Sequence, residues 1–361
     1  MSAHVNHTLQ ISSGHAAATV WVRLALVALV LIIIDPFARA DNPPVRLLRK
    51  LVVMGTECSV AVVAVDRGRA LAASEAAVEA LRAAEDRLTS WRADSELMRL
   101  NRSPVGVDVA LSEPLSVELA AAWRCREATG GAFEPAIGML TELWDLRGAG
   151  ARPDPRALAK ASLSSRQGAF VLRAARTARR VVDGAALDAG GFGKGAGLDR
   201  ALEALHAAPG VSGAALDLGG QLAYFGAAHP TEAFIANPRS RDRVVAVVAV
   251  PEESGSVSTS GAGPRSRRIG GEPLTQVIDP ETGSAVREYG SVTVWAPSAL
   301  MADCLSTGLY ALGADEAARW GRRHPEFGVA VIEINGGQLR LTPTGRFERT
   351  TSLLSPGEGK P

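Results

Sequence analysis

The order of the predicted strands and helices restricts the fold more than any other feature of the sequence. Val52–Val65 has the alternation of a strand, and Leu71–Leu88 and Leu115–Thr129 have the period of amphipathic helices. Strands and helices then follow in an irregular order, with further helices predicted at Gly195–His206 and Ser298–Leu312. A regular alternation would indicate the parallel sheet of a Rossmann-type array, and this order instead predicts a mixed α/β (α+β) enzyme fold.

Short strands and loops are predicted through the second half of the chain. Ser254–Arg268 is rich in Gly and Ser, which predicts a loop close to a site, and the polar residues 350–361 predict a disordered tail. The predicted strands are Phe170–Leu172, Arg180–Asp183, Gly213–Leu218, Val244–Val250, Leu274–Ile278, Ser291–Ala296, Val329–Ile334 and Gln338–Leu341.

The composition excludes some classes of protein. The 361 residues are 47% hydrophobic, which is enough for one large or two ordinary cores. Lys and Arg number 39 against 38 Asp and Glu, and the formal net charge of +1 gives no general attraction to nucleic acid or to an anionic membrane. A polyanionic ligand would therefore need a local site.

The N-terminus predicts export from the cytoplasm. Val20–Ile34 is an apolar run broken only by Arg23, and Ala38 and Ala40 are small residues that suit a signal peptidase. We expect residues 1–40 to be a signal peptide, with a mature start near Asp41 and a folded domain at 41–349. An uncleaved signal anchor is the alternative, although the run is shorter than the ~20 apolar residues of a comfortable membrane span.

Three cysteines lie far apart in the sequence, at Cys58, Cys125 and Cys304. Their odd number excludes a fully paired disulfide framework, and their spacing fits no zinc site. We expect them to be small buried hydrophobic residues.

A glycine-rich loop at Asp188–Lys194 precedes a predicted helix. Glycines let a ligand approach the backbone, and the N–H groups of a helix N-terminus attract anions. Lys194 adds a charge that could meet a phosphate. The loop is neither a Walker A motif nor a dinucleotide fingerprint, and taken alone it could be an ordinary connection.

Asp303 and Thr307 are four residues apart on a predicted helix and therefore share one face. A carboxylate and a hydroxyl on one face provide two oxygen ligands for a hard cation such as Mg²⁺. A helix cap or an internal hydrogen bond between the two residues is the alternative.

Two turn-like segments complete the candidate site. Asp279-Pro280 with Gly283 has good turn chemistry, and Ser258-Thr259-Ser260-Gly261 could contact a phosphate or solvate a bend. No Gly-x-Ser-x-Gly elbow surrounds these serines, which argues against a secreted hydrolase.

Taken together and in order, these segments resemble the ApbE family of FAD:protein FMN transferases. The resemblance spans roughly residues 50 to 335. It is carried by Met54-Gly55-Thr56, Leu88–Trp91, Asp94–Leu97, Leu100-Asn101, Thr129–Pro135 with Gly138, Asp188–Gly195, Asp217–Gly220, Thr259–Gly261, Ile278-Asp279-Pro280 with Thr282-Gly283, and Ala302-Asp303 with Thr307.

The resemblance implies a fold and a set of site residues. The fold would be two-lobed and T-fold-like, with mixed or antiparallel sheets flanked by helices. Mg²⁺ would be held by the backbone carbonyl of Gly191 and by Asp303 and Thr307. The residues implied to bind FAD are Met54, Trp91, Ala132, Phe133, Glu134, Asp188, Lys194 and Ile278.

The resemblance also implies a reaction in which a Ser or Thr hydroxyl of a target protein attacks FAD, receives FMN and releases AMP. Exported or membrane-associated electron-transfer flavoproteins would be the targets, in the periplasm or at the inner membrane facing it, and an N-terminal anchor would add an association with that membrane. Gln276 stands where the family usually has a histidine that could act as the base. Because glutamine cannot take up a proton near neutral pH, a non-catalytic or weakly active FAD-binding or flavin-delivery protein is the alternative.

Two smaller departures from the family pattern lie in the implied FAD site. Ala196 replaces a usual aromatic, and Glu134 replaces a usual aspartate.

Overall fold

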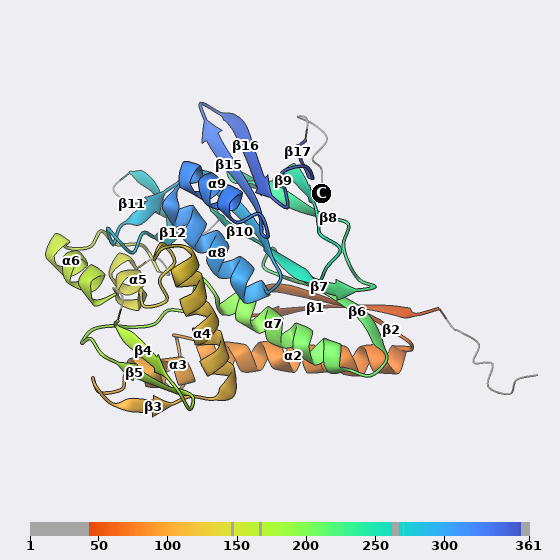
Figure 1. Cartoon of the computed structure of the whole chain (residues 1–361), viewed down its shortest axis with the longest axis horizontal. Coiled ribbons are helices and arrows are strands. Elements are labelled where there is room, and N and C mark those ends of the chain that lie inside the picture. The colour runs from red at the N-terminus through yellow and green to blue at the C-terminus, as the bar shows by residue number, and fades with distance from the viewer. Residues whose placement is uncertain (1–42, 146–147, 166–167, 262–266, 270, 355–361) are drawn as a thin grey trace, which may run out of the picture. The chain divides into compact units, whose positions relative to one another are not determined.

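An eight-stranded sheet forms the centre of the computed structural model, which describes residues 43–145, 148–165, 168–261, 267–269 and 271–354 (Figure 1). Each pairing between its strands is antiparallel. In spatial order the strands are β1 (Val45–Val53), β2 (Thr56–Ala64), β6 (Val211–Leu218), β7 (Gln221–Gly226), β10 (Gly255–Gly261), β14 (Gly290–Ala296), β15 (Gly328–Asn335) and β16 (Gln338–Gly345).

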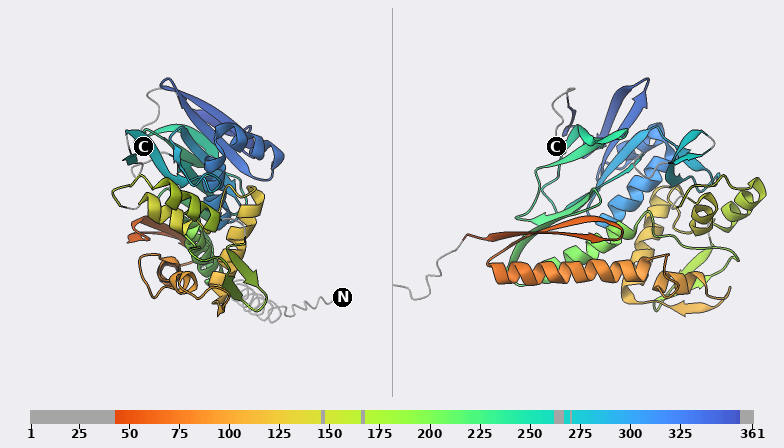
Figure 2. Two further views of the ribbon diagram at one scale, coloured as in Figure 1. Left: turned by 90° about the vertical axis from the view of Figure 1, so that its left-hand side faces the viewer. Right: turned by 180° about the vertical axis from the view of Figure 1, so that it is seen from behind.

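Helices pack on this sheet and on one another. α2 (Arg67–Leu88) and α7 (Gly193–Ala207) lie side by side near β1, β2 and β6, and α8 (Ala299–Leu312) packs on β10 and β14 (Figures 1 and 2). α4 (Glu113–Ala128) packs against α8. Side-chain caps explain where three of them begin, because Asp66, Ser112 and Ser298 each accept a backbone N–H of the first helical turn.

A smaller sheet also packs on the large one. β8 (Glu232–Asn237), β9 (Ser240–Ala249) and β17 (Thr351–Leu353) pair in the order β17-β9-β8, and Ile235 and Val248 pack with Tyr224 and Trp295 of the large sheet. The prediction of a disordered tail is therefore wrong for Thr351–Leu353, because backbone hydrogen bonds to β9 fix these residues. Residues 355–361 lie outside the described part of the chain.

The remaining elements are short. They are α3 (Glu96–Asn101), α5 (Gly138–Trp144), α6 (Pro155–Ser164), α9 (Ala314–Arg323), one sheet of β3 (Asp108–Ala110), β5 (Thr177–Arg180) and β4 (Phe170–Arg173), and another of β11 (Arg267–Ile269), β12 (Glu272–Ile278) and β13 (Ala285–Arg287). The strands predicted at Phe170–Leu172 and Arg180–Asp183 are present as the paired strands β4 and β5, but the second one begins at Thr177 and ends at Arg180.

The loop predicted for Ser254–Arg268 is wrong over its first half. Gly255–Gly261 is β10, an interior strand of the large sheet. Ser256 and Ser258 are buried there, and the Ser256 hydroxyl donates to the Leu222 carbonyl, so polar composition did not keep this strand at the surface. Residues 262–266 lie outside the described part of the chain.

All three cysteines are buried, as predicted, and two of them form a disulfide, which the sequence did not predict. Cys125 of α4 and Cys304 of α8 are joined, 179 residues apart in sequence. Cys58 is a free, buried thiol, and burial raises its pKa to about 11. Cys58 is thus the cysteine that keeps its thiol, whereas Cys125 and Cys304 are buried as a disulfide.

The predicted mixed α/β fold with antiparallel sheets and flanking helices is confirmed. The prediction for residues 1–40 lies outside the described residues. Among the helices that the structure describes, none combines the length and the apolar character required to cross a membrane.

Candidate functional site

A cavity of about 910 Å³ gathers all the site residues that the sequence predicted. It lies where the β1–β2 turn, the start of α7, α8 and β12 come together. The predicted residues that line it are Met54, Trp91, Ala132, Phe133, Glu134, Asp188, Gly191, Lys194, Gln276, Ile278, Asp303 and Thr307. Their individual roles stay predictions.

Met54 reaches the cavity because of the tight turn between β1 and β2. Met54 and Gly55 have φ values of 51° and 68°, which are typical of the two central residues of a type I′ hairpin turn. Met54 also packs on α7, since a Cβ added to Gly197 would come within 2.8 Å of the Met54 methyl carbon. The left-handed conformation is strained for a residue with a side chain, and strained residues of this kind cluster at functional sites.

Trp91 lies at the opening of the cavity, with 76% of the residue exposed to solvent. So large an exposed aromatic surface is available to stack on a planar ligand. Its segment is fixed by the N-cap of α3, where the Ser95 hydroxyl accepts the Met98 N–H and donates to the Thr89 carbonyl.

Hydrogen bonds hold the start of the glycine-rich loop, and α7 continues from its end. Asn101 clamps its start, because the Asn101 side chain both donates to the Leu187 carbonyl (2.9 Å) and accepts the Leu187 N–H (2.8 Å). The Asp188 carboxylate accepts the Gly190 N–H at 2.6 Å. α7 begins at Gly193, two residues earlier than predicted, so Lys194 belongs to the first helical turn.

Close packing of α7 on α8 brings the loop and Asp303 together. A Cβ at Gly195 would lie 2.3 Å from the Ala299 carbonyl oxygen, so a larger residue would force the helices apart. Asp199 of α7 accepts the Ser298 hydroxyl (2.7 Å) and the Ala299 and Leu300 N–H groups. α7 thereby caps α8 and fixes its start relative to the loop.

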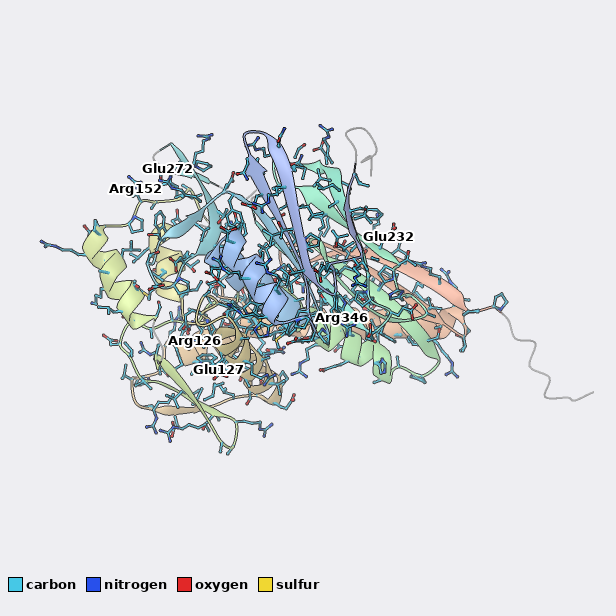
Figure 3. The ribbon with its side chains drawn as sticks, turned by 45° about the horizontal axis from the view of Figure 1, so that its top comes forward. Arg126, Glu127, Arg152, Glu232, Glu272 and Arg346 are labelled. Atoms are coloured by element: carbon cyan, nitrogen blue, oxygen red, sulfur yellow. A yellow bond between two sulfur atoms is a disulfide. The ribbon has the colours of Figure 1, made fainter. Side chains whose placement is uncertain are left out.

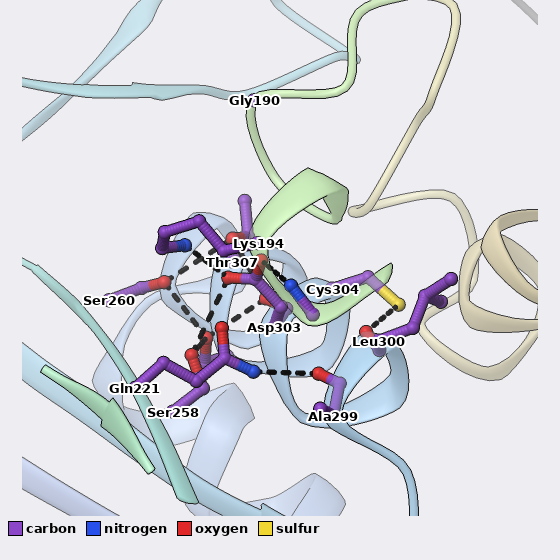
Figure 4. Close-up of polar contacts among 12 residues, drawn as sticks. Gly190, Lys194, Gln221, Ser258, Ser260, Ala299, Leu300, Asp303, Cys304 and Thr307 are labelled. Carbon is purple, nitrogen blue, oxygen red and sulfur yellow. Dashed lines mark hydrogen bonds and ion pairs between the residues drawn. The ribbon is translucent and has the colours of Figure 1, made fainter. Parts of the chain in front are cut away.

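Asp303 is the polar centre of the site (Figure 4). The residue is 2% exposed, and its carboxylate accepts the Lys194 ammonium at 2.8 Å and the Gly195 N–H at 3.0 Å. The Ser258 hydroxyl of β10 lies 3.5 Å from the same carboxylate oxygen as Lys194. An anion at this place is favoured by the N-terminus of α7.

The other two predicted metal ligands, Gly191 and Thr307, lie close to Asp303. The Thr307 hydroxyl donates to the Asp303 backbone carbonyl at 3.0 Å and lies 3.3 Å from the Ser260 hydroxyl, so one lone pair of its oxygen stays available for a cation. A Cβ added to Gly191 would come within 3.4 Å of the Thr307 hydroxyl oxygen, so the Gly191 backbone lies against it. Carboxylate, hydroxyl and carbonyl oxygens form a donor set that fits a hard cation.

The predicted metal ligands are not a cluster of acidic, histidine or cysteine side chains. Among the described residues, no group of three or more His, Cys, Asp or Glu side chains is arranged to hold a metal ion. Of the three predicted metal ligands only Asp303 has an acidic side chain, so a cation here would need ligand oxygens or water to complete its shell.

The Phe133-Glu134 segment forms another wall. Glu134 is 6% exposed, and its carboxylate accepts the Arg126 guanidinium at 2.5 Å and the Ala136 N–H at 3.0 Å. Burial raises the pKa of this carboxyl above its ordinary value, and the pairing with Arg126 partly opposes that shift. Arg126, labelled in Figure 3, thus supports a residue that the sequence had assigned to FAD.

Gln276 and Ile278 come from β12, in a sheet separate from the large one. Gln276 is exposed to the cavity, whereas Ile278 is buried. The Asp279 turn that follows is an ordinary one, in which the Asp279 carboxylate accepts the Glu281 N–H and the Thr282 hydroxyl.

Sequence reasoning missed the supports of this site. Asn101 bonds to Leu187 across 86 residues of sequence, and Arg126 bonds to Glu134 across eight, and no local pattern pairs either residue with its partner. The hydroxyl network behind Asp303 was half recognised, because Ser260 was flagged but not its 2.9 Å contact with the Ser306 hydroxyl.

Comparisons with known proteins identify the family of this chain. The ApbE family model matches residues 54–331. A FAD:protein FMN transferase of Klebsiella pneumoniae is 33% identical over 298 residues, 78% of this chain and 82% of the relative. One from Treponema pallidum is 32% identical over 326 residues, 84% of this chain and 89% of the relative.

Solved structures show the same fold. The flavin transferase ApbE from Vibrio cholerae has a TM-score of 0.72 at 21% identity, covering 85% of this chain and 100% of that one. The apo form of the Pseudomonas stutzeri flavinyl transferase ApbE has a TM-score of 0.75 at 22% identity, covering 86% and 98%. With the family model matched over most of its length, this chain belongs to the ApbE family.

Proposed function

We propose that this protein is a Mg²⁺-dependent FAD:protein FMN transferase, which moves FMN from FAD to a Ser or Thr hydroxyl of a target protein and releases AMP. The observation that carries the proposal is the meeting of Lys194, Asp303 and Thr307 at the N-terminus of α7, inside the cavity. Family membership and the names of the relatives support the same activity.

The residues of the cavity suit the pyrophosphate of FAD and its ring systems. The α7 N-terminus and Lys194 would bind the pyrophosphate, because free N–H groups and an ammonium favour phosphate oxygens. The exposed face of Trp91 and the thioether of Met54 offer apolar surface for a ring system.

Asp303, Thr307 and the Gly191 carbonyl would hold Mg²⁺, which when bound would neutralise phosphate charge and act as a Lewis acid. Buried Asp303 is kept in place by the Gly195 N–H and by the serines of β10 and α8. Transfer then depends mainly on positioning and charge neutralisation, as in other phosphoryl transfers.

A second candidate function follows from Gln276. This residue faces the cavity but cannot accept the proton of the attacking hydroxyl near pH 7. A protein that binds FAD and delivers or stores it, with little or no transfer, is therefore the alternative.

One experiment separates the two functions. The purified protein is incubated with FAD, Mg²⁺ and exported electron-transfer flavoproteins, and AMP release and covalent flavin fluorescence are measured. Gln276→His serves as the matched variant, and a restored general base is expected to accelerate transfer by ~10²-fold or more. FAD binding without AMP release or labelled target, in both forms, would establish the delivery function instead.

We also propose that the protein acts in the periplasm or at the inner membrane facing it. The Cys125–Cys304 disulfide supports this location, because structural disulfides persist in oxidising compartments and are rare in the cytosol. The apolar run at Val20–Ile34 supports export. In protein taken directly from cells and unfolded in denaturant, Cys58 should react with maleimide at once, whereas Cys125 and Cys304 should react only after a reductant is added. Immediate labelling of Cys125 or Cys304 would contradict the proposal.

A further inference from the structure

Lys194 is placed where a lysine is normally unfavourable. It lies in the first turn of α7, at the positive end of the helix dipole, and that turn contains no acidic residue. Within the described part of the chain, the Lys194 ammonium pairs with the Asp303 carboxylate of the neighbouring helix at 2.8 Å. The pair thus compensates two charges that would each be costly alone.

The two carboxylate oxygens of Asp303 have different partners. One oxygen of Asp303, Oδ2, accepts the Gly195 N–H from α7. The other, Oδ1, accepts Lys194 and lies 3.5 Å from the Ser258 hydroxyl. The Lys194 ammonium therefore occupies the place that a metal ion could take beside Oδ1, the carboxylate oxygen without a hydrogen bond from the backbone.

We propose that Lys194 closes the metal site until FAD arrives, and so couples the binding of FAD to that of Mg²⁺; this inference rests on the proposed function. A phosphate group at the α7 N-terminus gives the ammonium another anion to pair with. Lys194 then leaves Asp303, and the freed carboxylate oxygen accepts the metal.

The exposure of the two side chains suits this exchange. Asp303 is fixed, with 3% of its side chain exposed, whereas 33% of the Lys194 side chain is exposed and the residue lines the cavity. A lysine has a flexible four-carbon stem, so its ammonium can move while the helix stays in place. Only Lys194 has to change position.

The exchange has a measurable consequence for the metal alone. Without FAD, Mg²⁺ must displace an ammonium and leave it unpaired at the positive end of a helix. With Lys194 removed, that cost disappears, while the carboxylate becomes an uncompensated buried anion. The metal-only affinity should therefore rise in a variant that loses this charge, although the protein loses an FAD contact.

Isothermal titration of MgCl₂ into the full-length protein without FAD tests the proposal. Lys194→Met and Lys194→Gln should bind Mg²⁺ more tightly than the wild type by about fivefold or more, the lower end of usual coupling between sites. Both should bind FAD more weakly. Lys194→Arg, which keeps the charge, and Lys160→Met, which removes an exposed lysine outside the cavity, should match the wild type in metal-only affinity.

Two outcomes are decisive. Unchanged or weaker metal-only binding in folded Lys194→Gln, which retains an amide donor for Asp303, overturns the proposed coupling. Asp303→Asn separates this result from failure of the function itself, because that variant should lose Mg²⁺ with and without FAD. Wild-type Mg²⁺ affinity in Asp303→Asn would refute the metal site as well.

Discussion

Replacing Arg126 by methionine should destabilise the protein strongly, because it leaves a buried carboxylate without its charged partner. The Arg126 and Glu134 side chains are 15% and 5% exposed. Methionine keeps much of the apolar stem of arginine, so lost packing contributes little. After the change, the Glu134 carboxylate retains the hydrogen bond from the Ala136 N–H.

Breaking a buried pair by removing one partner costs about 3–5 kcal/mol. The retained Ala136 N–H and the partial exposure of Arg126 place this case at the lower end, at about 3 kcal/mol in the free energy of unfolding. Urea unfolding at pH 7 measures this value. The double variant Arg126→Met with Glu134→Gln removes the uncompensated charge, and should recover most of the loss.

The loss should also depend on pH. Burial raises the pKa of Glu134 above its ordinary value of 4.5, so the folded state favours its protonated form. The cost of the carboxylate is largest above the raised pKa and disappears as the pH falls towards 4.5. The deficit of Arg126→Met should therefore shrink between pH 7 and pH 5.

A surface pair provides the control for this prediction. Arg179→Met breaks the contact with Asp108 between β5 and β3, where both side chains are substantially exposed, and should leave stability near that of the wild type. If the single and double Arg126 variants lose the same stability at every pH, the uncompensated charge of Glu134 is not the cause.

Three further predictions concern packing, the disulfide and the ligand surface. Gly195→Ala should lower the free energy of unfolding by about 1–3 kcal/mol in urea, since its Cβ would lie 2.3 Å from the Ala299 oxygen, whereas Gly193→Ala, with its nearest contact at 3.4 Å, should not. Reducing the Cys125–Cys304 bond should cost about 2–4 kcal/mol, and equal unfolding curves with and without reductant would contradict this. Trp91→Ala should weaken FAD binding in fluorescence titrations by about 0.5–1.5 kcal/mol without changing the melting temperature, and a fall in that temperature would show a structural role instead.

The sequence predicted most of the elements because their signals are local. The helix at Leu71–Leu88 has an apolar face and an Asp66 cap, and the structure extends it by one turn to Arg67. The strand at Gly255–Gly261 was missed, because its serines look like loop residues. They are buried in pairs with hydroxyls and carbonyls of other elements, and such partners are set by tertiary structure.

The site was predictable as a set of residues but not as a geometry. Spacing placed Asp303 and Thr307 on one face of a helix, and the family resemblance supplied the rest. The pairing of Lys194 with Asp303 depends on the close approach of α7 and α8 at Gly195, which no periodicity reveals. The disulfide was missed for the same reason, since 179 residues separate its cysteines.

The residues proposed to bind the ligand and the residue at the position of the base belong to different parts of the fold. Lys194, Asp303 and Thr307 lie on α7 and α8, which pack on the large sheet, and the disulfide ties α8 to α4. Gln276 belongs to β12, in the separate three-stranded sheet. A change at position 276 can therefore remove a base without disturbing the residues that would hold FAD and the metal, which is why we expect Gln276 to affect the rate of transfer far more than the affinity for FAD.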